Sequence, residues 1–102
     1  MNYVSLIGTL EGSPRVVNKK GLDCVECKIT TTKDVINKAG VRTQQIETHV
    51  VFAWGKWSRI LLAHSSPNLK VAVEGEIVNF FTHYKGRVFK HTEIEINDLI
   101  LM

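Results

Sequence analysis

The chain has 102 residues, of which 44% are hydrophobic and 23% charged, values typical of a folded protein and not of a disordered one. Its 13 lysines and arginines against 10 acidic residues give a net charge of +3, which mildly favours a polyanionic partner. No apolar run approaches the roughly 20 residues that cross a bilayer, and the N-terminus lacks the basic region and cleavage site of a secretion signal. We therefore expect one domain over residues 1–102, without a membrane partner, in a cytoplasm or in an organelle of bacterial origin.

Three strands are predicted in the first half of the chain, because apolar and β-branched residues alternate with polar ones there. These strands cover residues 2–10, 22–32 and 46–54. The Glu-Gly-Ser-Pro sequence at 11–14 is predicted to end the first strand. The polar stretch 33–45 holds a glycine and is predicted to be a long mobile loop.

One helix and two further strands are predicted in the second half. Apolar residues recur at helical spacing over 56–65, beginning with Trp57, and Pro67 predicts the end of this helix. Strands follow at 70–84 and 88–101. Three strands, a helix and two strands is the connectivity of an OB-fold. The predicted fold class is therefore all-β, a five-stranded Greek-key barrel with one short α-helix between strands 3 and 4.

The two cysteines lie three residues apart in the sequence Cys-Val-Glu-Cys, a spacing found in metal and redox sites. A structural zinc site needs four ligands, and no second cysteine pair or close histidine pair occurs in the sequence. Strand residues three apart point to opposite faces, which favours a core thiol at Cys27 and a surface thiol at Cys24. We predict no metal site and no cofactor, and an enzyme that uses these thiols is disfavoured.

Motifs of catalysis are also missing from the sequence. It contains no glycine-rich phosphate loop, no paired carboxylates at a telling spacing and no nucleophile motif such as Gly-x-Ser-x-Gly. The four histidines are scattered, with no His-x-x-x-His pair. We therefore predict that the protein is not an enzyme.

The strand faces that point away from the predicted core are rich in apolar and aromatic residues. They carry Phe52, Trp54, Val78, Phe80 and Tyr84. An exposed apolar face on a small protein marks an interface, and two partners compete for it: unpaired bases, which stack on aromatic rings, or another subunit. Cations flank these segments, which favours nucleic acid because a single strand needs cations along its phosphates. The cations are Lys33, Lys38, Arg42, Lys56, Arg59, Lys85, Arg87 and Lys90.

Four segments resemble the single-stranded-DNA-binding (SSB) proteins of bacteria, and they occur in the order found in that family. Residues 8–16 follow its Gly-x-Leu-x-x-x-Pro-x-Val pattern, and the third strand ends in an aromatic residue followed by Gly55 and Lys56. VAVEGEI at 71–77 resembles its fourth strand, and TEIEINDLILM at 92–102 its closing strand. The resemblance implies a non-enzymatic, sequence-tolerant binder of single-stranded DNA in replication, repair or recombination, with RNA as an alternative ligand.

The resemblance also implies roles for single residues. Trp54 falls where the family has a base-stacking aromatic residue, Trp57 where it has a buried helix residue, and His49 near its subunit interface. The nucleic-acid-binding residues that we predict are Trp54, Phe80, Tyr84, Phe52, Lys33, Lys56, Arg59, Lys85, Arg87 and Lys90. The family is usually a tetramer built from dimers, so we expect a homodimer or homotetramer with Tyr3, Ser5 and His49 at its interface.

Several positions depart from the family pattern. Thr48, Val35 and Thr82 stand where the family has stacking tryptophans, and the chain stops at Met102 without the family's acidic-tipped tail. These departures favour a specialised paralogue of the tailless, primosomal-replication-protein N type, associated with the nucleoid. The alternative hypothesis is an oligomerisation or protein-interaction module of a primosome or replication complex, with weak or no DNA binding.

Overall fold

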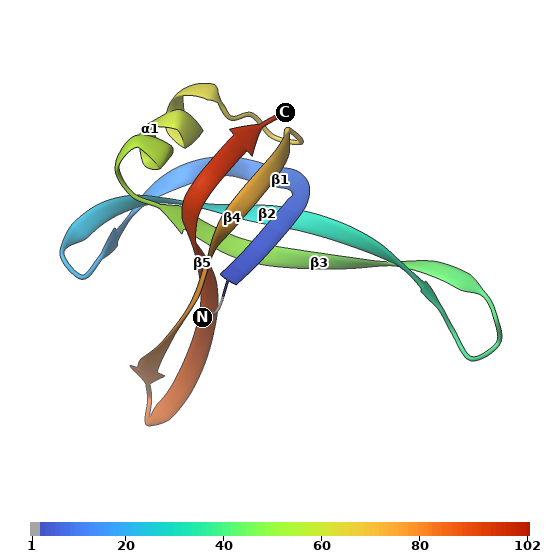
Figure 1. Ribbon diagram of the computed structural model, residues 1–102. Coiled ribbons are helices and arrows are strands. Elements are labelled where there is room, and N and C mark those ends of the chain that lie inside the picture. The colour runs from blue at the N-terminus through green and yellow to red at the C-terminus, as the bar shows by residue number, and fades with distance from the viewer. Residues whose placement is uncertain (1–2) are drawn as a thin grey trace.

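The computed structural model describes residues 3–102, which form a closed barrel of five long strands (Figure 1). The strands are β1 (Tyr3–Lys19), β2 (Leu22–Ile36), β3 (Arg42–Ala53), β4 (Lys70–Tyr84) and β5 (Arg87–Leu101), and the helix α1 (Gly55–His64) lies between β3 and β4. Around the barrel the order is β1-β2-β3-β5-β4. The pairing of β3 with β5 is parallel and the other pairings are antiparallel. This architecture confirms the expected all-β OB-fold. Within residues 3–102, no helix has the length and apolar character that a bilayer crossing requires.

Apolar side chains from every strand fill the barrel, because alternate residues of a strand point to the same side of the sheet. Leu61 of α1 is fully buried against them, and Trp57 and Ile60 pack on the same cluster while partly buried. The helix therefore covers one end of the barrel, and the expected core position of Trp57 is confirmed. The buried cluster consists of Leu10, Val25, Cys27, Ile29, Val51, Ala53, Leu61, Val71, Val73, Ile94, Ile96 and Leu99.

Two glycines lie where neighbouring strands approach each other most closely. A Cβ atom on Gly75 would lie 2.1 Å from the backbone oxygen of Glu95, and a Cβ atom on Gly8 would lie 2.4 Å from that of Thr30. Backbone atoms cannot move aside as the end of a flexible side chain can. Only glycine fits at these two positions, and at Gly75 the close approach coincides with a shift in the β4–β5 register.

The expectation that residues 11–14 end the first strand is wrong. β1 runs through this segment, and its pairing with β2 changes register between Glu11 and Arg15. Such a β-bulge bends a strand without ending it. The bend allows one strand to serve two sides of the barrel: β1 pairs with β4 over residues 3–9 and with β2 over residues 9–19.

The expectation of a long loop at 33–45 is also wrong. β2 and β3 remain paired as far as Ile36 and Arg42, so that only a short turn joins them. Within this turn the side-chain oxygen of Asn37 accepts hydrogen bonds of 2.9 Å from the backbone N–H groups of Ala39 and Val41. The segment is polar because this part of the hairpin extends away from the barrel and is largely exposed on both faces.

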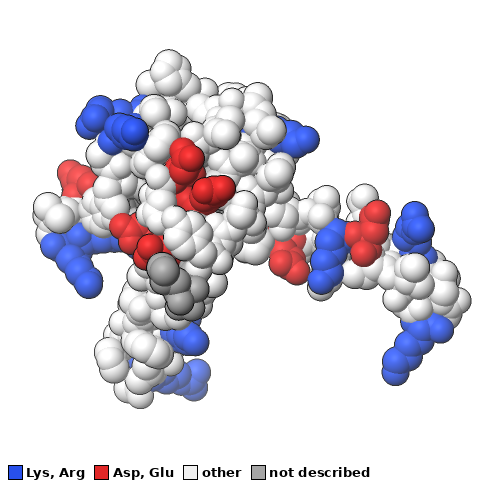
Figure 2. Space-filling model, in the orientation of Figure 1, with Lys and Arg blue, Asp and Glu red and all other residues white. Residues whose placement is uncertain are grey.

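Three hairpins extend from the barrel as arms, formed by β1 with β2, β2 with β3 and β4 with β5 (Figure 1). Lysines and arginines lie at the ends of the three arms and on the upper part of the barrel, while acidic side chains lie on the barrel and along the arm of β2 and β3 (Figure 2). The ends of the arms therefore carry positive charge.

Candidate nucleic-acid interface

A groove on the outside of the barrel collects aromatic residues from β3 and β4. Its volume is about 570 Å³, and its apolar lining consists of Leu22, Phe52, Trp54, Val78, Phe80 and Phe81. Lys19 and Lys20, at the end of the β1–β2 arm, line it as well, together with Glu95 of β5. The groove therefore brings together three of the predicted stacking residues and two lysines that were not predicted.

Lys19 lies between two of the aromatic rings. Its Nζ atom is 4.8 Å from the ring centroid of Phe52 and 4.9 Å from that of Phe80, distances at which a cation is attracted to the face of a ring. Phe80 also stacks on His91, with centroids 4.8 Å apart and ring planes 13° apart. One ammonium group thus contacts rings from both β3 and β4.

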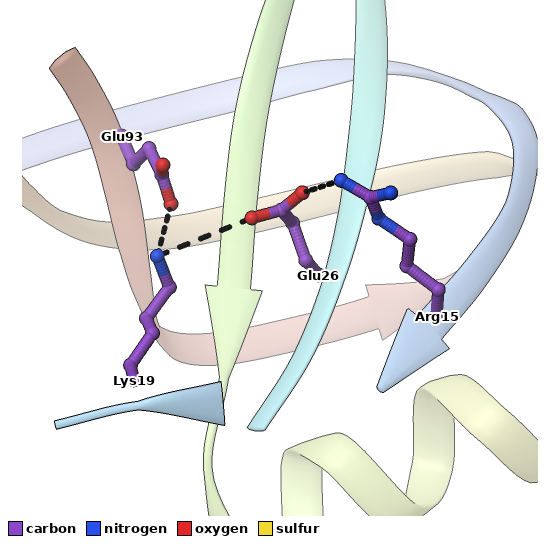
Figure 3. A network of polar contacts seen from close by, with 4 residues as sticks. All are labelled: Arg15, Lys19, Glu26 and Glu93. Atoms are coloured by element: carbon purple, nitrogen blue, oxygen red, sulfur yellow. Dashed lines mark hydrogen bonds and ion pairs between the residues drawn. The ribbon is translucent and has the colours of Figure 1, made fainter. Parts of the chain in front are cut away.

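The same ammonium group belongs to a network of ion pairs that joins three strands (Figure 3). Lys19 Nζ lies 2.8 Å from Glu93 Oε1 on β5 and 4.0 Å from Glu26 Oε2 on β2. Arg15 in turn donates a hydrogen bond of 2.9 Å to Glu26. Glu93 is 8% exposed, and a carboxylate with so little access to water needs a charged partner. The network therefore ties the end of β1 to β2 and β5.

The expectation of an exposed Phe52 is wrong, although the residue does lie on the outer side of the barrel. Only 4% of its surface is accessible, because Lys19 lies over its ring and Trp54 packs edge-on against it at 6.0 Å between centroids. Trp54 itself is half-buried and lines the groove. Among the predicted stacking residues, Trp54 is therefore more accessible within the groove than Phe52.

The remaining predicted residues lie outside the groove. Tyr84, Lys85, Arg87 and Lys90 are exposed on the β4–β5 arm, where Lys85 Nζ is 5.4 Å from the ring centroid of Tyr84. Lys33 is exposed on the β2–β3 arm, and Lys56 and Arg59 are exposed on α1. The predicted cations are thus spread over two arms and the helix. Sequence reasoning missed Lys19 and Lys20 at the groove and the exposed Phe89 on the β4–β5 arm.

The residues predicted for a subunit interface lie on two different faces. Tyr3 and Ser5 are exposed on β1, opposite Glu76 and Glu74 of β4. His49 shares the inward face of β3 with the core residue Val51, and its Nε2 atom lies 3.1 Å from the hydroxyl of Thr31. One flat contact would not cover all three residues.

Both cysteine thiols are buried. Cys27 lies in the core as expected, but Cys24 is only 2% exposed, so the expectation of a surface thiol is wrong. Burial raises the pKa of the Cys27 thiol from 9.0 to about 12, and burial also raises the pKa of Cys24. A raised pKa leaves little of the reactive thiolate. Among residues 3–102, no three metal-binding side chains are grouped to hold an ion.

The buried Cys27 thiol predicts that the protein loses stability in alkaline solution. The unfolded chain releases the proton near its ordinary pKa of 9.0, whereas the folded chain holds it until about 12. The stabilisation is therefore complete below about pH 9 and is lost as the pH rises toward 12. Urea unfolding at about pH 8 and about pH 11 measures this loss, which should be smaller in Cys27→Ala than in the unaltered protein. Equal losses in the two proteins would contradict the assignment to Cys27.

No protein-family model matches this chain, and no curated protein matches it in sequence. Solved structures do match it in shape. The Plasmodium falciparum SSB in complex with ssDNA has a TM-score of 0.88 at 16% identity, over 100% of this chain and 95% of that one. A deletion mutant of the Thermus aquaticus single-stranded DNA binding protein has a TM-score of 0.84 at 17% identity, over 100% of this chain and 50% of that one.

The small single-stranded DNA-binding protein of Streptomyces coelicolor has a TM-score of 0.74 at 12% identity, over 98% of this chain and 93% of that one. At such low identity these likenesses establish the fold. They agree with the closed barrel and with the helix between β3 and β4.

Proposed function

We propose that the protein binds single-stranded DNA without sequence preference and without catalysing a reaction. The observation that carries this proposal is the aromatic groove with lysines at its edge, on a barrel whose arms carry cations outward. Solved structures of the same fold further support the proposal, and one of them is an SSB in complex with ssDNA.

The chemistry of the groove suits unpaired bases. Every base has a flat face that stacks on an aromatic ring, so a binder that relies on stacking tolerates any sequence. In a duplex these faces are already stacked on one another and cannot enter an aromatic groove. Bases would enter beside Trp54, while the phosphates would contact Lys20 and the cations of the arms. A role in replication, repair or recombination follows as part of this proposal.

A second face of the barrel supports assembly of the chain with itself. Ile7, Ala72 and Ile100 lie in one row across β1, β4 and β5, and the two isoleucines are 61% and 58% exposed. Exposed isoleucines that adjoin across strands mark a protein contact better than isolated ones do. We propose a homodimer or homotetramer that uses the Tyr3 and Ser5 side of β1. The alternative function, an interaction module of a primosome or replication complex, would use this face and leave the groove without DNA.

Titration with oligothymidylate tests the proposed DNA binding. We expect quenching of tryptophan fluorescence, and a logarithm of affinity that falls linearly with the logarithm of salt concentration, by about 0.7 for each phosphate contact. Duplex DNA of equal length is the control and should bind more weakly. Absence of quenching at low salt, or an affinity indifferent to salt, would contradict single-strand binding and favour the interaction module. The mass of the free protein in solution measures its oligomeric state.

A further inference from the structure

We infer that in the free protein the ammonium group of Lys19 occupies a position between the rings of Phe52 and Phe80, called the seat below, and that a base of the bound strand displaces it. The displaced ammonium group then pairs with a phosphate of the same strand. This inference rests on the proposed function. It makes Lys19 a residue that selects for ligands carrying both a flat ring and a phosphate.

The contacts of Lys19 define the seat. Its ammonium group lies within 5 Å of both ring centroids, at 4.8 Å and 4.9 Å, so a group that replaces it meets both rings. Phe52 is 4% exposed with Lys19 in place, and Phe80 is stacked on His91. A base therefore cannot lie on the face of Phe52 that Lys19 covers until the lysine moves.

The exchange is close to balanced in its ring contacts. The attraction of a cation to the face of an aromatic ring and the stacking of a base on a ring are of comparable strength. The ion pair of Lys19 with Glu93 disfavours the displacement of Lys19, because leaving a buried carboxylate unpaired is costly. A phosphate that receives the ammonium group restores an ionic partner for Lys19 but not for Glu93, so the base stacked on the two rings has to offset the remaining cost. A base without a phosphate, or a phosphate without a base, supplies only half of this compensation.

Lys19 lies at the end of a strand, beside an exposed turn at the edge of the groove. Lys19 is the last residue of β1, and the turn that follows it consists of Lys20 and Gly21, both with left-handed φ angles of 52° and 82°. The turn belongs to the β1–β2 arm, whose residues Asn18 and Lys20 are exposed. A lysine on a flexible four-carbon stem at this point can leave the rings without unfolding the barrel.

Nuclear magnetic resonance of the unaltered protein tests the exchange. The ε-methylene protons of Lys19 lie beside two aromatic rings in the free protein, so we expect their signals to be shifted upfield by the ring currents. Saturation with oligothymidylate should remove this shift. Persistence of the upfield shift in the saturated complex would overturn the inference while leaving the proposed function intact. If oligothymidylate changes no signal at all, it is the proposed function that fails.

A pair of variants tests the second half of the exchange. The double substitution Lys19→Met and Glu93→Gln removes both charges together and so leaves no buried carboxylate unpaired. We expect the slope of log affinity against log salt to decrease by about 0.7, the value for one phosphate contact on a single strand. Lys70→Met, on an exposed residue of β4 that pairs with Thr9, is the control and should leave the slope unchanged.

An unchanged slope in the folded double variant would overturn the transfer of Lys19 to phosphate. Competition by inorganic polyphosphate gives a second readout. Polyphosphate cannot fill the seat and gains no contact with Lys19 in either protein, whereas oligothymidylate loses its contact with Lys19 in the double variant. Polyphosphate should therefore compete with oligothymidylate better in the double variant than in the unaltered protein. Equal competition in the two proteins would contradict the selective role of Lys19. The resonance measurement does not depend on the folding of either variant.

Discussion

The substitution Trp54→Ala is expected to weaken the binding of oligothymidylate by roughly 5- to 150-fold, which corresponds to the loss of about 1–3 kcal/mol of stacking on one ring. Trp54 lines the groove, is half-buried, and holds its ring edge-on to Phe52 at the junction of β3 and α1. It is not a member of the buried core cluster. Its loss should therefore affect the groove far more than the barrel, and fluorescence anisotropy of a labelled oligothymidylate measures the change.

Trp57→Phe is the matched control, because the second tryptophan lies only three residues away but packs on the core. The side chain of Lys56 covers it, with Nζ 4.6 Å from its ring centroid. We expect Trp57→Phe to lower the free energy of unfolding by about 1 kcal/mol and to leave the affinity unchanged. If Trp57→Phe reduced affinity and Trp54→Ala reduced only stability, the assignment of the groove as the base-binding site would be wrong.

Gly75→Ala is expected to lower the free energy of unfolding by about 3 kcal/mol or more, since an added methyl group in a tightly packed place forces the backbone to shift. The new Cβ atom would lie 2.1 Å from the backbone oxygen of Glu95 and 3.0 Å from a methyl group of Ile94. Relief of this clash requires β4 and β5 to separate where their register shifts. Urea unfolding followed by circular dichroism measures the loss.

Gly40→Ala separates this close approach from the general effect of replacing glycine. Gly40 has a φ angle of 78° in the β2–β3 turn, but a Cβ atom there would meet nothing within 4 Å. The expected cost is about 1–2 kcal/mol, which reflects the left-handed backbone alone. A cost for Gly75→Ala no larger than that for Gly40→Ala would show that the strands have room for a methyl group.

The order of strands and helix could be predicted because alternation and helical spacing are local properties. The bulge in β1 could not, because Gly12 and Pro14 are as common in turns as in bulges, and only the distant partner strand decides between them. The sequence predicts a loop in place of the β2–β3 arm for a similar reason. A hairpin that leaves the barrel has no buried face, so its sequence lacks the alternation that marks a strand.

The candidate groove could be predicted in part. Alternation alone places Phe52 and Trp54 on the outer side of β3. The burial of Phe52 by the Lys19 side chain could not be predicted, because the residues around Lys19 have the composition of a polar turn. Its ion-pair partner Glu93 lies 74 residues further along the chain. Cys24 was expected at the surface for the same reason: one strand's alternation tells which side a residue faces, but not whether another segment covers it.

The parallel pairing of β3 with β5 has a consequence for the order in which the parts of the barrel fold. Its register joins Val51 to Ile94 and Phe52 to Glu95, residues far apart in the chain, whereas β1–β2, β2–β3 and β4–β5 are hairpins of neighbouring segments. Contacts between distant segments carry the larger entropic cost of closing a loop, so we expect this pairing, like that of β1 with β4, to form late. Phe52 belongs to the β3–β5 pairing and also lines the groove. A nascent or partly unfolded chain would therefore lack the groove, and only the fully folded barrel would bind a single strand there.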